Sequence, residues 1–271
     1  VDNNAIGLKA VENICDDMFL FNFLTTVKLE DYSKATTVPS VRKSEIEGIS
    51  FPLPPLPEQQ AIVAKIEELL SDLENGKQQL QTAQQQLKVY RQSLLKWAFE
   101  GKLTNKNVKD GELPKGWKWV KVNELRTKEL NSICAGPFGT IFKAKDFRPS
   151  GIPIIFLRHV KAGSYNTRKP GYMDEGIWKD LFKSYSVYGG ELLITKLGEP
   201  PGECAIYPNG IGPAMVTPDV IKMNVDESSA VPKFLMYYFN SENSRKALKD
   251  IAFGSTRLRI TIPIFKNLPV P

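Results

Sequence analysis

The stretch from Glu58 to Phe99 reads EQQAIVAKIEELLSDLENGKQQLQTAQQQLKVYRQSLLKWAF. Its apolar side chains recur at alternating spacings of four and three residues, which is the 3.5-residue period of a coiled coil. No proline interrupts the stretch, and residues that form helices readily fill most of the remaining positions. The pattern therefore predicts one helix of about 42 residues, roughly 63 Å long at ~1.5 Å per residue.

The predicted helix has recognisable start and stop signals. The proline-rich segment 51–57 cannot continue a helix backwards, and Gly101 follows the last turn as a C-terminal cap would. An alternative is a long amphipathic helix on a globular body, but such a helix usually shows a wider apolar face with period 3.6. We therefore expect a coiled-coil interface made by Ile62, Ile66, Leu69, Leu73, Leu80, Ala83, Leu87, Tyr90 and Leu94.

The totals are those of a soluble protein. A chain of 271 residues suits two domains, or one domain with a long appendage, and 42% apolar residues are enough to build a core. The longest uncharged apolar runs are far too short to cross a bilayer, and no secretory signal opens the chain. Cys15, Cys134 and Cys204 form no C-x-x-C pair, which is typical of reduced thiols in the cytoplasm. We expect a cytoplasmic protein without membrane contact.

The net charge of +6 is shared unevenly along the chain. Residues 115–271 hold 23 Lys and Arg against 14 Asp and Glu, whereas residues 1–114 hold 13 against 16. The second part thus carries about +9 and the first about −3. A basic domain of this kind favours a polyanion such as nucleic acid as its partner, although surplus lysine also serves solubility.

The two ends of the chain repeat one order of elements. At the start we predict a strand over residues 5–9, an aromatic helix over 18–24, and a strand over 41–54 that leads into the prolines. At the far end another aromatic segment begins at Lys233, and a strand over 258–271 closes with Pro-x-Pro. Arg42 matches Arg259, and Pro52-Leu-Pro54 matches Pro269-Val-Pro271, at a distance of 217 residues. The chain therefore contains one period of a larger unit plus a fragment of the preceding copy, and a second long helix would follow Pro271 in a complete protein.

The region after the long helix is rich in short β segments. It opens with an alternating stretch over 113–122, and further strands are predicted over 152–157, 191–195 and 220–223, each bounded by glycine or proline. Helices are predicted over Asp174–Phe182 and over Pro232–Phe253. This pattern indicates an α+β domain around a twisted, mostly mixed sheet.

Several motifs carry a resemblance to a known family. The segment ISFPLPPLPEQ at residues 49–59 precedes the long helix, and AFEGKLT at 98–104 follows it. Further landmarks are LPKGW at 113–117, GPFGT at 136–140, YGGELLI at 188–194 and LPVP at 268–271. With these motifs the chain resembles the specificity (S) subunit of bacterial Type I restriction-modification enzymes, over nearly its whole length.

The resemblance implies a DNA-reading scaffold in which two target recognition domains each read one half of a split target. It implies an α+β fold with one mixed-sheet recognition domain, a long coiled-coil helix and a fragment of a second recognition domain. The corresponding boundaries are 1–54 for the end of the first recognition domain, 55–110 for the conserved helix and 111–271 for the second recognition domain. The helix would also dock methyltransferase subunits and, through them, restriction subunits. Cofactors such as S-adenosylmethionine, Mg and ATP would then belong only to those partners.

This sequence departs from the family pattern because it lacks most of the first recognition domain and the whole second conserved helix. Either it is part of a longer subunit, or it works as a half-subunit that pairs with a copy of itself. In the second case, two copies would form a homodimer through their long helices.

No motif in the chain predicts catalysis. The zinc motif H-E-x-x-H, the phosphate-binding G-x-x-x-x-G-K-[ST] and the dinucleotide motif G-x-G-x-x-G are all missing from the sequence. The lone His159 has no acidic and nucleophilic companions in a recognisable motif, so it is more often structural or phosphate-contacting than a general base. We therefore expect neither enzymatic activity nor a metal site.

Basic residues collect instead in the turns of the second domain. Loop arginines and lysines reach phosphates, and arginine pairs in two-point fashion with guanine. The predicted DNA-binding residues are Lys143, Lys145, Arg148, Arg158, His159, Lys161, Tyr165, Arg168, Lys169, Lys196, Arg257 and Arg259. The alternative function is a coiled-coil assembly protein whose basic domain binds another protein or nothing.

Overall fold

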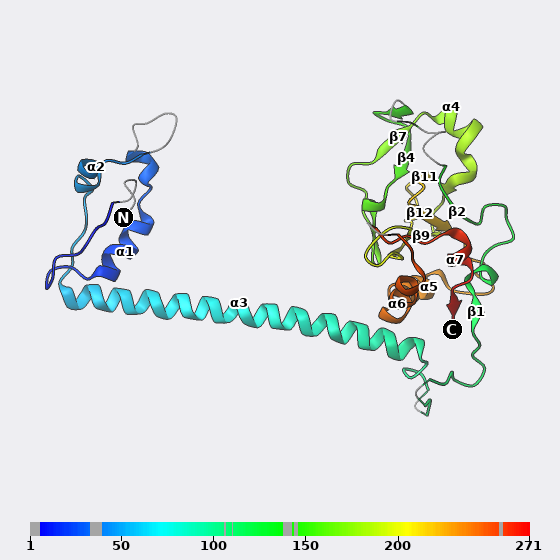
Figure 1. Ribbon diagram of the computed structural model, residues 1–271, viewed down its shortest axis with the longest axis horizontal. Helices are drawn as coiled ribbons and strands as arrows, with labels where there is room; N and C mark the ends of the chain where they lie inside the picture. Colours follow the sequence, from blue (N-terminus) through cyan, green and yellow to red (C-terminus); the bar gives the residue numbers. More distant parts are fainter. Residues whose placement is uncertain are drawn as a thin grey trace. The chain divides into compact units, whose positions relative to one another are not determined.

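The predicted long helix is present in the computed structural model as α3, Leu56–Phe99, a single helix of 44 residues (Figure 1). The structure describes residues 6–32, 40–105, 107–109, 111–137, 143, 146–254 and 257–271. The chain divides into two compact units, unit 1 from Val1 to Gln86 and unit 2 from Leu87 to Pro271. The boundary between the units lies within α3, so each unit contains part of this helix.

Unit 1 is built around the start of α3. Its other helices are α1 (Asp17–Thr26) and α2 (Lys43–Glu47), with a 3-10 turn at Leu29–Tyr32. The carboxylate of Asp16 caps α1 by accepting hydrogen bonds from the backbone N–H groups of Met18 and Phe19, at 2.9 Å each. The ring of Phe51 packs against Phe19 and Phe23, with centroids 5.7 and 4.8 Å away.

A buried glutamine joins α3 to the rest of unit 1. The side chain of Gln59 is 0% exposed. Its Oε1 accepts a hydrogen bond from the backbone N–H of Asp16 (2.8 Å), and its Nε2 donates to the carbonyl groups of Ile14 (2.9 Å) and Pro54 (2.7 Å). Among the described residues of unit 1, only Phe19, Gln59 and Val63 are buried. The three hydrogen bonds of Gln59 are therefore a main contribution to the stability of this small unit.

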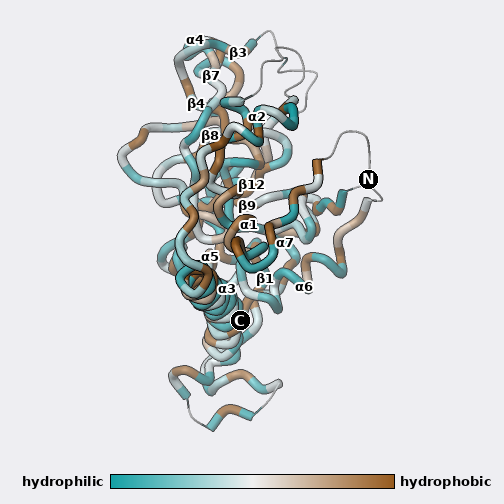
Figure 2. Tube along the Cα trace, turned by 90° about the vertical axis from the view of Figure 1, so that its left-hand side faces the viewer, coloured by the Kyte–Doolittle hydropathy of each residue, from teal (hydrophilic) through white to brown (hydrophobic). Residues whose placement is uncertain are grey.

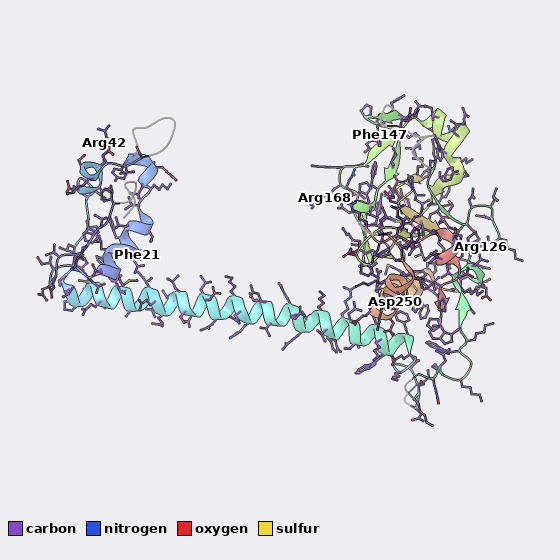
Figure 3. The ribbon with its side chains drawn as sticks, viewed as in Figure 1. Phe21, Arg42, Arg126, Phe147, Arg168 and Asp250 are labelled. Atoms are coloured by element: carbon purple, nitrogen blue, oxygen red, sulfur yellow. The ribbon has the colours of Figure 1, made fainter. Side chains whose placement is uncertain are left out.

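Helix α1 consists mainly of apolar residues, which the tube of Figure 2 colours brown. Of its residues, Phe19 alone is buried. Phe21 of this helix is 57% exposed (Figure 3), and Met18 is also exposed. The exposed part of the Phe21 ring contributes no burial energy to unit 1.

Unit 2 contains two larger sheets made of short strands. The strands are β1 (Val120–Lys121), β2 (Ile133–Ala135), β3 (Phe147–Arg148), β4 (Ile152–Ile155), β5 (Val160–Lys161), β6 (Ser164–Tyr165), β7 (Gly171–Met173), β8 (Ser186–Val187), β9 (Leu192–Thr195), β10 (Cys204–Ile206), β11 (Ala214–Val216), β12 (Val220–Met223) and β13 (Pro269–Val270). One sheet has the order β10-β9-β12-β2 and is antiparallel, and the other has the order β3-β7-β4-β11-β8. In the second sheet β11 and β4 are parallel, whereas the other neighbours are antiparallel. Strands β5 and β6 form a separate hairpin, and β1 pairs with β13.

Helices cover the outer faces of these sheets. They are α4 (Glu175–Ile177), which continues as a π-helical turn over Trp178–Phe182, α5 (Pro232–Phe239), α6 (Glu242–Ile251) and α7 (Ile262–Lys266). Short 3-10 turns occupy Val122–Glu124, Leu157–His159 and Lys183–Tyr185. The α+β class with mixed sheets and one long helix is confirmed.

The side chains of the central strands alternate between two cores. On β9, Leu192 and Ile194 pack with residues of α5, α6 and α7, whereas Leu193 faces the second core, which contains Ile155 and Val216 of the other sheet. A third core lies around Trp178 and Phe182. Burying one such side chain contributes about 1.5–3 kcal/mol, which is why β9, buried on both faces, is mainly apolar. β12 is also buried throughout, but it contains Lys222, whose ammonium lies 3.9 Å from the carboxylate of Glu191.

The end of α3 packs onto the first of these cores. Phe99 is buried, and its ring lies 5.2 Å from those of Phe234 and Tyr238 on α5, in edge-on contact. The side-chain oxygen of Gln92 accepts a hydrogen bond from the backbone N–H of Glu242, at the start of α6 (3.1 Å). The last turns of α3 are thus part of unit 2.

Two predicted strands each contain a five-residue helix instead, and local capping explains both helices. Over residues 41–54 the structure has α2, where the backbone N–H of Arg42 donates to the carboxylate of Glu45 (2.8 Å). Over residues 258–271 it has α7, capped by the hydroxyl of Thr261, and only Pro269–Val270 is a strand. Polar caps at the right spacing outweighed the β-branched content of these segments.

Three further predictions were wrong in extent. Ile6–Lys9 form no regular element, and Ala5 lies outside the described residues. The expected strand over 113–122 is reduced to β1, because a turn in which Trp117 N–H donates to Pro114 (3.0 Å) precedes it. The helix expected over Pro232–Phe253 is divided into α5 and α6, because the Ser241 hydroxyl caps a new helix.

The repeat predicted from the two ends has a structural counterpart. In unit 1 the N–H groups of Ile14 and Cys15 donate to the carbonyl of Val11, just before α1. In unit 2 the N–H groups of Ser229 and Ala230 donate in the same way to Asp226, just before α5. Five-residue helices, α2 and α7, then precede the two Pro-x-Pro segments. Both copies therefore build the same turn before the aromatic helix and a short helix before Pro-x-Pro, which supports the repeat.

Candidate nucleic-acid interface

Three of the predicted DNA-binding residues line one cavity of unit 2. Arg158, Lys161 and Arg257 surround an open cavity of about 530 Å³. The other lining residues are Phe156, Leu157, Leu197, Gly198, Glu203 and Asp219. We call this the basic cavity. Arg158 and Arg257, almost 100 positions apart in the sequence, thus bring their charges to the same cavity.

Two segments form the walls of the basic cavity. The first leaves β4, passes through the 3-10 turn Leu157–His159 and enters the β5–β6 hairpin, whose turn needs Gly163 because its φ is +79°. The second is residues 196–198, which lie beside 257–260: Ile260 N–H donates to Lys196 O (3.0 Å) and Gly198 N–H to Leu258 O (3.2 Å). Both walls rest on buried strands, so the cavity has a rigid base.

Arg158 is held in place by aromatic and backbone contacts. Its guanidinium carbon lies 4.3 Å from the centroid of the Phe156 ring, a cation–π contact. Its Nη2 donates to the carbonyl of Lys169 (3.0 Å). Phe156 in turn stacks on Phe147, with centroids 6.0 Å apart. Arg158 is exposed, so its remaining N–H donors can bind an anionic partner.

The other two cations of the cavity are not paired within the protein. Lys161 and Arg257 are both exposed, and neither side chain makes a hydrogen bond or ion pair with any residue that the structure describes. Lys196 is half-buried, and Arg259 is exposed and bonded through its backbone to Phe253. Both residues belong to the second wall, where their neighbours in the sequence, Leu197 and Arg257, line the cavity.

The remaining basic residues lie elsewhere on unit 2. Arg168 and Lys169 are exposed in the loop between β6 and β7, and Figure 3 shows Arg168 projecting from the same side as Phe147. Arg148 is exposed on β3, and Lys143 is exposed before it. Lys145 lies outside the described residues. These cations extend the basic surface beyond the cavity.

Two of the predicted residues face inward. His159 is 1% exposed, and its Nδ1 accepts a hydrogen bond from the backbone N–H of Phe156 (3.1 Å). Burial, reinforced by the charge of Arg158, lowers the pKa of His159. Tyr165 is half-buried against the rings of His159 and Tyr207, and burial raises the pKa of its hydroxyl. Neither residue lines the basic cavity, and only Tyr165 is partly exposed.

Sequence reasoning missed the acidic side of the same cavity. Glu203 and Asp219 both line it, although our selection considered only basic residues and tyrosines. The sequence contains no signal for this, because Asp219 lies 61 positions after Arg158 and 38 before Arg257. Only the pairing of the strands brings these groups together.

The predicted coiled-coil seam is largely exposed in this chain. Leu73, Leu80 and Leu87 are 68, 67 and 66% exposed, and Leu69, Ala83 and Tyr90 are exposed too. Ile62, Ile66 and Leu94 are half-buried. The middle of α3 therefore presents a continuous apolar stripe.

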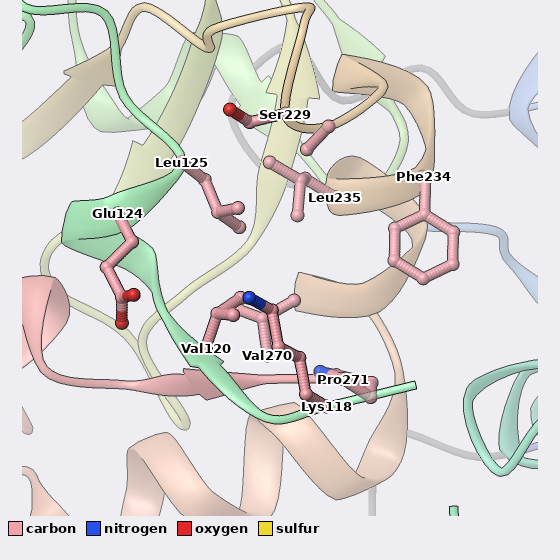
Figure 4. A pocket seen from close by; sticks show the side chains of 10 residues that line it. Lys118, Val120, Glu124, Leu125, Ser229, Phe234, Leu235, Val270 and Pro271 are labelled. Atoms are coloured by element: carbon pink, nitrogen blue, oxygen red, sulfur yellow. The ribbon is translucent and has the colours of Figure 1, made fainter. Parts of the chain in front are cut away.

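A second cavity, of about 440 Å³, lies beside β1 and α5 (Figure 4). It is lined mainly by apolar side chains, among them Val120, Phe234 and Val270, and by the charged groups of Lys118 and Glu124. No set of three or more metal-ligating side chains occurs among the described residues. Nor is any helix in the described part of the chain both long and apolar enough to span a bilayer.

Comparison with known proteins finds similarity to the family that the motifs resemble. Residues 1–82 match the model of the Type I restriction modification DNA specificity domain. Over its full length the chain is 27% identical to the Type I restriction enzyme MjaVIII specificity subunit of Methanocaldococcus jannaschii. Over 39% of its length it is 34% identical to the EcoDI specificity subunit of Escherichia coli. The chain is thus similar in sequence to Type I specificity subunits.

The solved structures agree with this relationship at the level of the fold. The HsdS subunit from Thermoanaerobacter tengcongensis aligns with 95% of the chain at a TM-score of 0.60 and 21% identity. A chain from a structure concerning complex assembly and conformational transition of the type I R-M system aligns with 93% at a TM-score of 0.53. The chain spans 59% of that HsdS subunit and 63% of the Methanocaldococcus specificity subunit. It thus corresponds to less than two thirds of these relatives.

Proposed function

We propose that the chain is a non-catalytic, sequence-specific DNA-binding part of a Type I specificity subunit. Unit 2 binds one half of a bipartite target, and α3 sets the distance to the other half. The observation that carries this proposal is the basic cavity, where Arg158, Lys161 and Arg257 converge on a domain related to DNA specificity subunits. The name of the matching family model, which includes DNA specificity, points the same way.

The electrostatics of the cavity suit a duplex. Two of its three cations have no partner among the described residues, so their charges are available to phosphates. Each phosphate neutralised releases a condensed counterion, which makes such binding strongly salt-dependent. The surplus of about nine positive charges over residues 115–271 acts in the same direction by steering DNA to this unit.

Catalysis, in this proposal, belongs to partner subunits in the cytoplasm. Methyltransferase subunits dock on α3, bring S-adenosylmethionine, and connect the chain to restriction subunits that use ATP and Mg. The chain alone should therefore neither transfer a methyl group nor cut DNA. Methyl transfer by the pure chain, supplied with S-adenosylmethionine and duplex, would overturn this division of labour.

The domain boundaries follow from the same assignment. Residues 1–54 would be the end of a first recognition domain, 55–110 the conserved helix and 111–271 the second recognition domain. The matching turns before α1 and α5 support an origin of both segments in one kind of domain. The exposed apolar side chains of α1, such as Phe21, are consistent with a partial domain.

A second candidate function rests on the exposed seam of α3. Leu73, Leu80 and Leu87 form a stripe that favours pairing with another helix, so the chain could act as a coiled-coil scaffold whose unit 2 binds a protein. Pairing of two copies through α3 is compatible with both candidates.

DNA binding can be tested by fluorescence anisotropy with random-sequence duplexes over a salt series. The variant Lys161→Ala/Arg257→Ala should bind more weakly and lower the salt slope by about one per lost phosphate contact. The matched control, Lys179→Ala/Lys233→Ala, removes two exposed cations that do not line the cavity. Equal affinities and slopes for both variants and wild type would refute the proposal and favour the scaffold.

A further inference from the structure

One acidic side chain stands out within the basic cavity. Asp219 is exposed there, and its carboxylate makes no hydrogen bond or ion pair with the residues that the structure describes. Glu203, the other acid of the cavity, interacts electrostatically with Arg245. Burial lowers the pKa of the Arg245 guanidinium, and the charge of Glu203 opposes this effect. Asp219 is therefore a free acceptor beside three cations.

The backbone around Asp219 is firmly held. Its carbonyl accepts a hydrogen bond from Lys196 N–H (2.8 Å), and Val220 N–H donates to Thr217 O (3.1 Å) to close the turn. The hydroxyl of Thr217 donates to the carbonyl of Ile155 (2.8 Å), and Val220 is fully buried. The backbone from which the Asp219 side chain projects is therefore fixed, which limits where its carboxylate can reach.

The chemistry of a carboxylate selects among the partners that DNA offers. A carboxylate accepts hydrogen bonds and repels phosphates, so it adds nothing to binding of the backbone. In the major groove, thymine and guanine present acceptors that repel it, and adenine presents the acceptor N7 beside its amino group. Cytosine presents the N4 amino donor without a neighbouring acceptor. The guanine paired with that cytosine offers O6 and N7, which suit a guanidinium such as that of Arg257.

From this we infer that Asp219 reads a cytosine in the target half-site by accepting a hydrogen bond from its N4 amino group. The inference rests on the proposed function, because it assigns a specificity-determining residue to the same cavity. Lys161 and Arg158 then position the phosphates, whereas Asp219 contributes discrimination and no affinity for DNA in general.

The test is selection from a random duplex library by the full chain assembled with its modification subunits. Wild type should select a motif with one required C·G pair that Asp219→Ala no longer requires, with a loss of about tenfold in discrimination at that pair alone. Asp219→Asn should shift the preference there to adenine, because an amide pairs with both N6 and N7. The control Glu227→Gln, an exposed acid that does not line the cavity, should leave the motif unchanged.

A second measurement uses a single modified base at the selected position. Replacing that cytosine by 2-pyrimidinone, which lacks the amino group, should weaken wild-type binding about tenfold and Asp219→Ala binding hardly at all. An identical motif for wild type and Asp219→Ala would overturn the role of Asp219 while leaving DNA reading intact. A wild-type complex that selects no motif would overturn the proposed function as well, so the two failures are distinguishable.

Discussion

The hydrogen bonds of Gln59 allow a sharp test of how unit 1 is held to α3. Replacing Gln59 by leucine keeps a side chain of similar size but removes an acceptor for Asp16 N–H and a donor to the carbonyl groups of Ile14 and Pro54. The substitution leaves α3 itself intact, since leucine is a good helix former. We expect the tertiary contacts of α1 to weaken while the helix content of α3 stays unchanged.

The magnitude follows from the number of bonds. Each net hydrogen bond contributes about 1 kcal/mol, so losing three in a site that is 0% exposed should cost about 3 kcal/mol. Because 1.4 kcal/mol is a factor of ten, the opening equilibrium of α1 should rise on the order of 100-fold. Amide hydrogen exchange reports that equilibrium directly for each segment.

Exchange measured by mass spectrometry over Asp17–Thr26 is therefore the appropriate assay, with α5 in unit 2 as an internal reference that should not change. The matched control is Gln60→Leu, the same substitution at the exposed neighbouring position. Equal exchange rates in wild type and Gln59→Leu would refute the reasoning. So would an equal acceleration by the Gln60→Leu variant, because that side chain makes none of these bonds.

Two further predictions concern the seam and the buried histidine. If two copies pair through α3, Leu80→Asp/Leu87→Asp should convert a dimer into a poorly soluble or partly unfolded monomer. Light scattering would report the mass, and circular dichroism would report the loss of helix. A wild-type chain that is a stable monomer at high micromolar concentration would contradict self-pairing. Burial lowers the pKa of His159, so the unfolded state takes up a proton near pH 6.5 while the folded state does not. The free energy of unfolding should therefore fall as the pH drops below about 6.5, and His159→Gln should lack this component in denaturant titrations; identical pH profiles for the two proteins would rule it out.

The similarity to Type I specificity subunits was accessible from the sequence because its landmarks are short continuous motifs. The proline-rich segment 51–57 and the helix after it can be identified without any tertiary contact. The same holds for LPKGW at residues 113–117, although that segment proved to be a turn before β1 and not a strand. Local sequence thus identified the relatives more reliably than it predicted each local structure.

By itself the sequence determined α3, because a helix depends on contacts within a few residues and its 3.5-residue period runs unbroken through the segment. It also determined the excess of positive charge in the second half, since charge simply adds along the chain. Tertiary structure alone decided which charges meet. Arg158 and Arg257 share a cavity with Asp219 only because β4 pairs in parallel with β11, some 60 residues later, and residues 196–198 lie beside 257–260. Such long-range registers are chosen by burial of both faces of the sheets at once, and no local pattern contains that information.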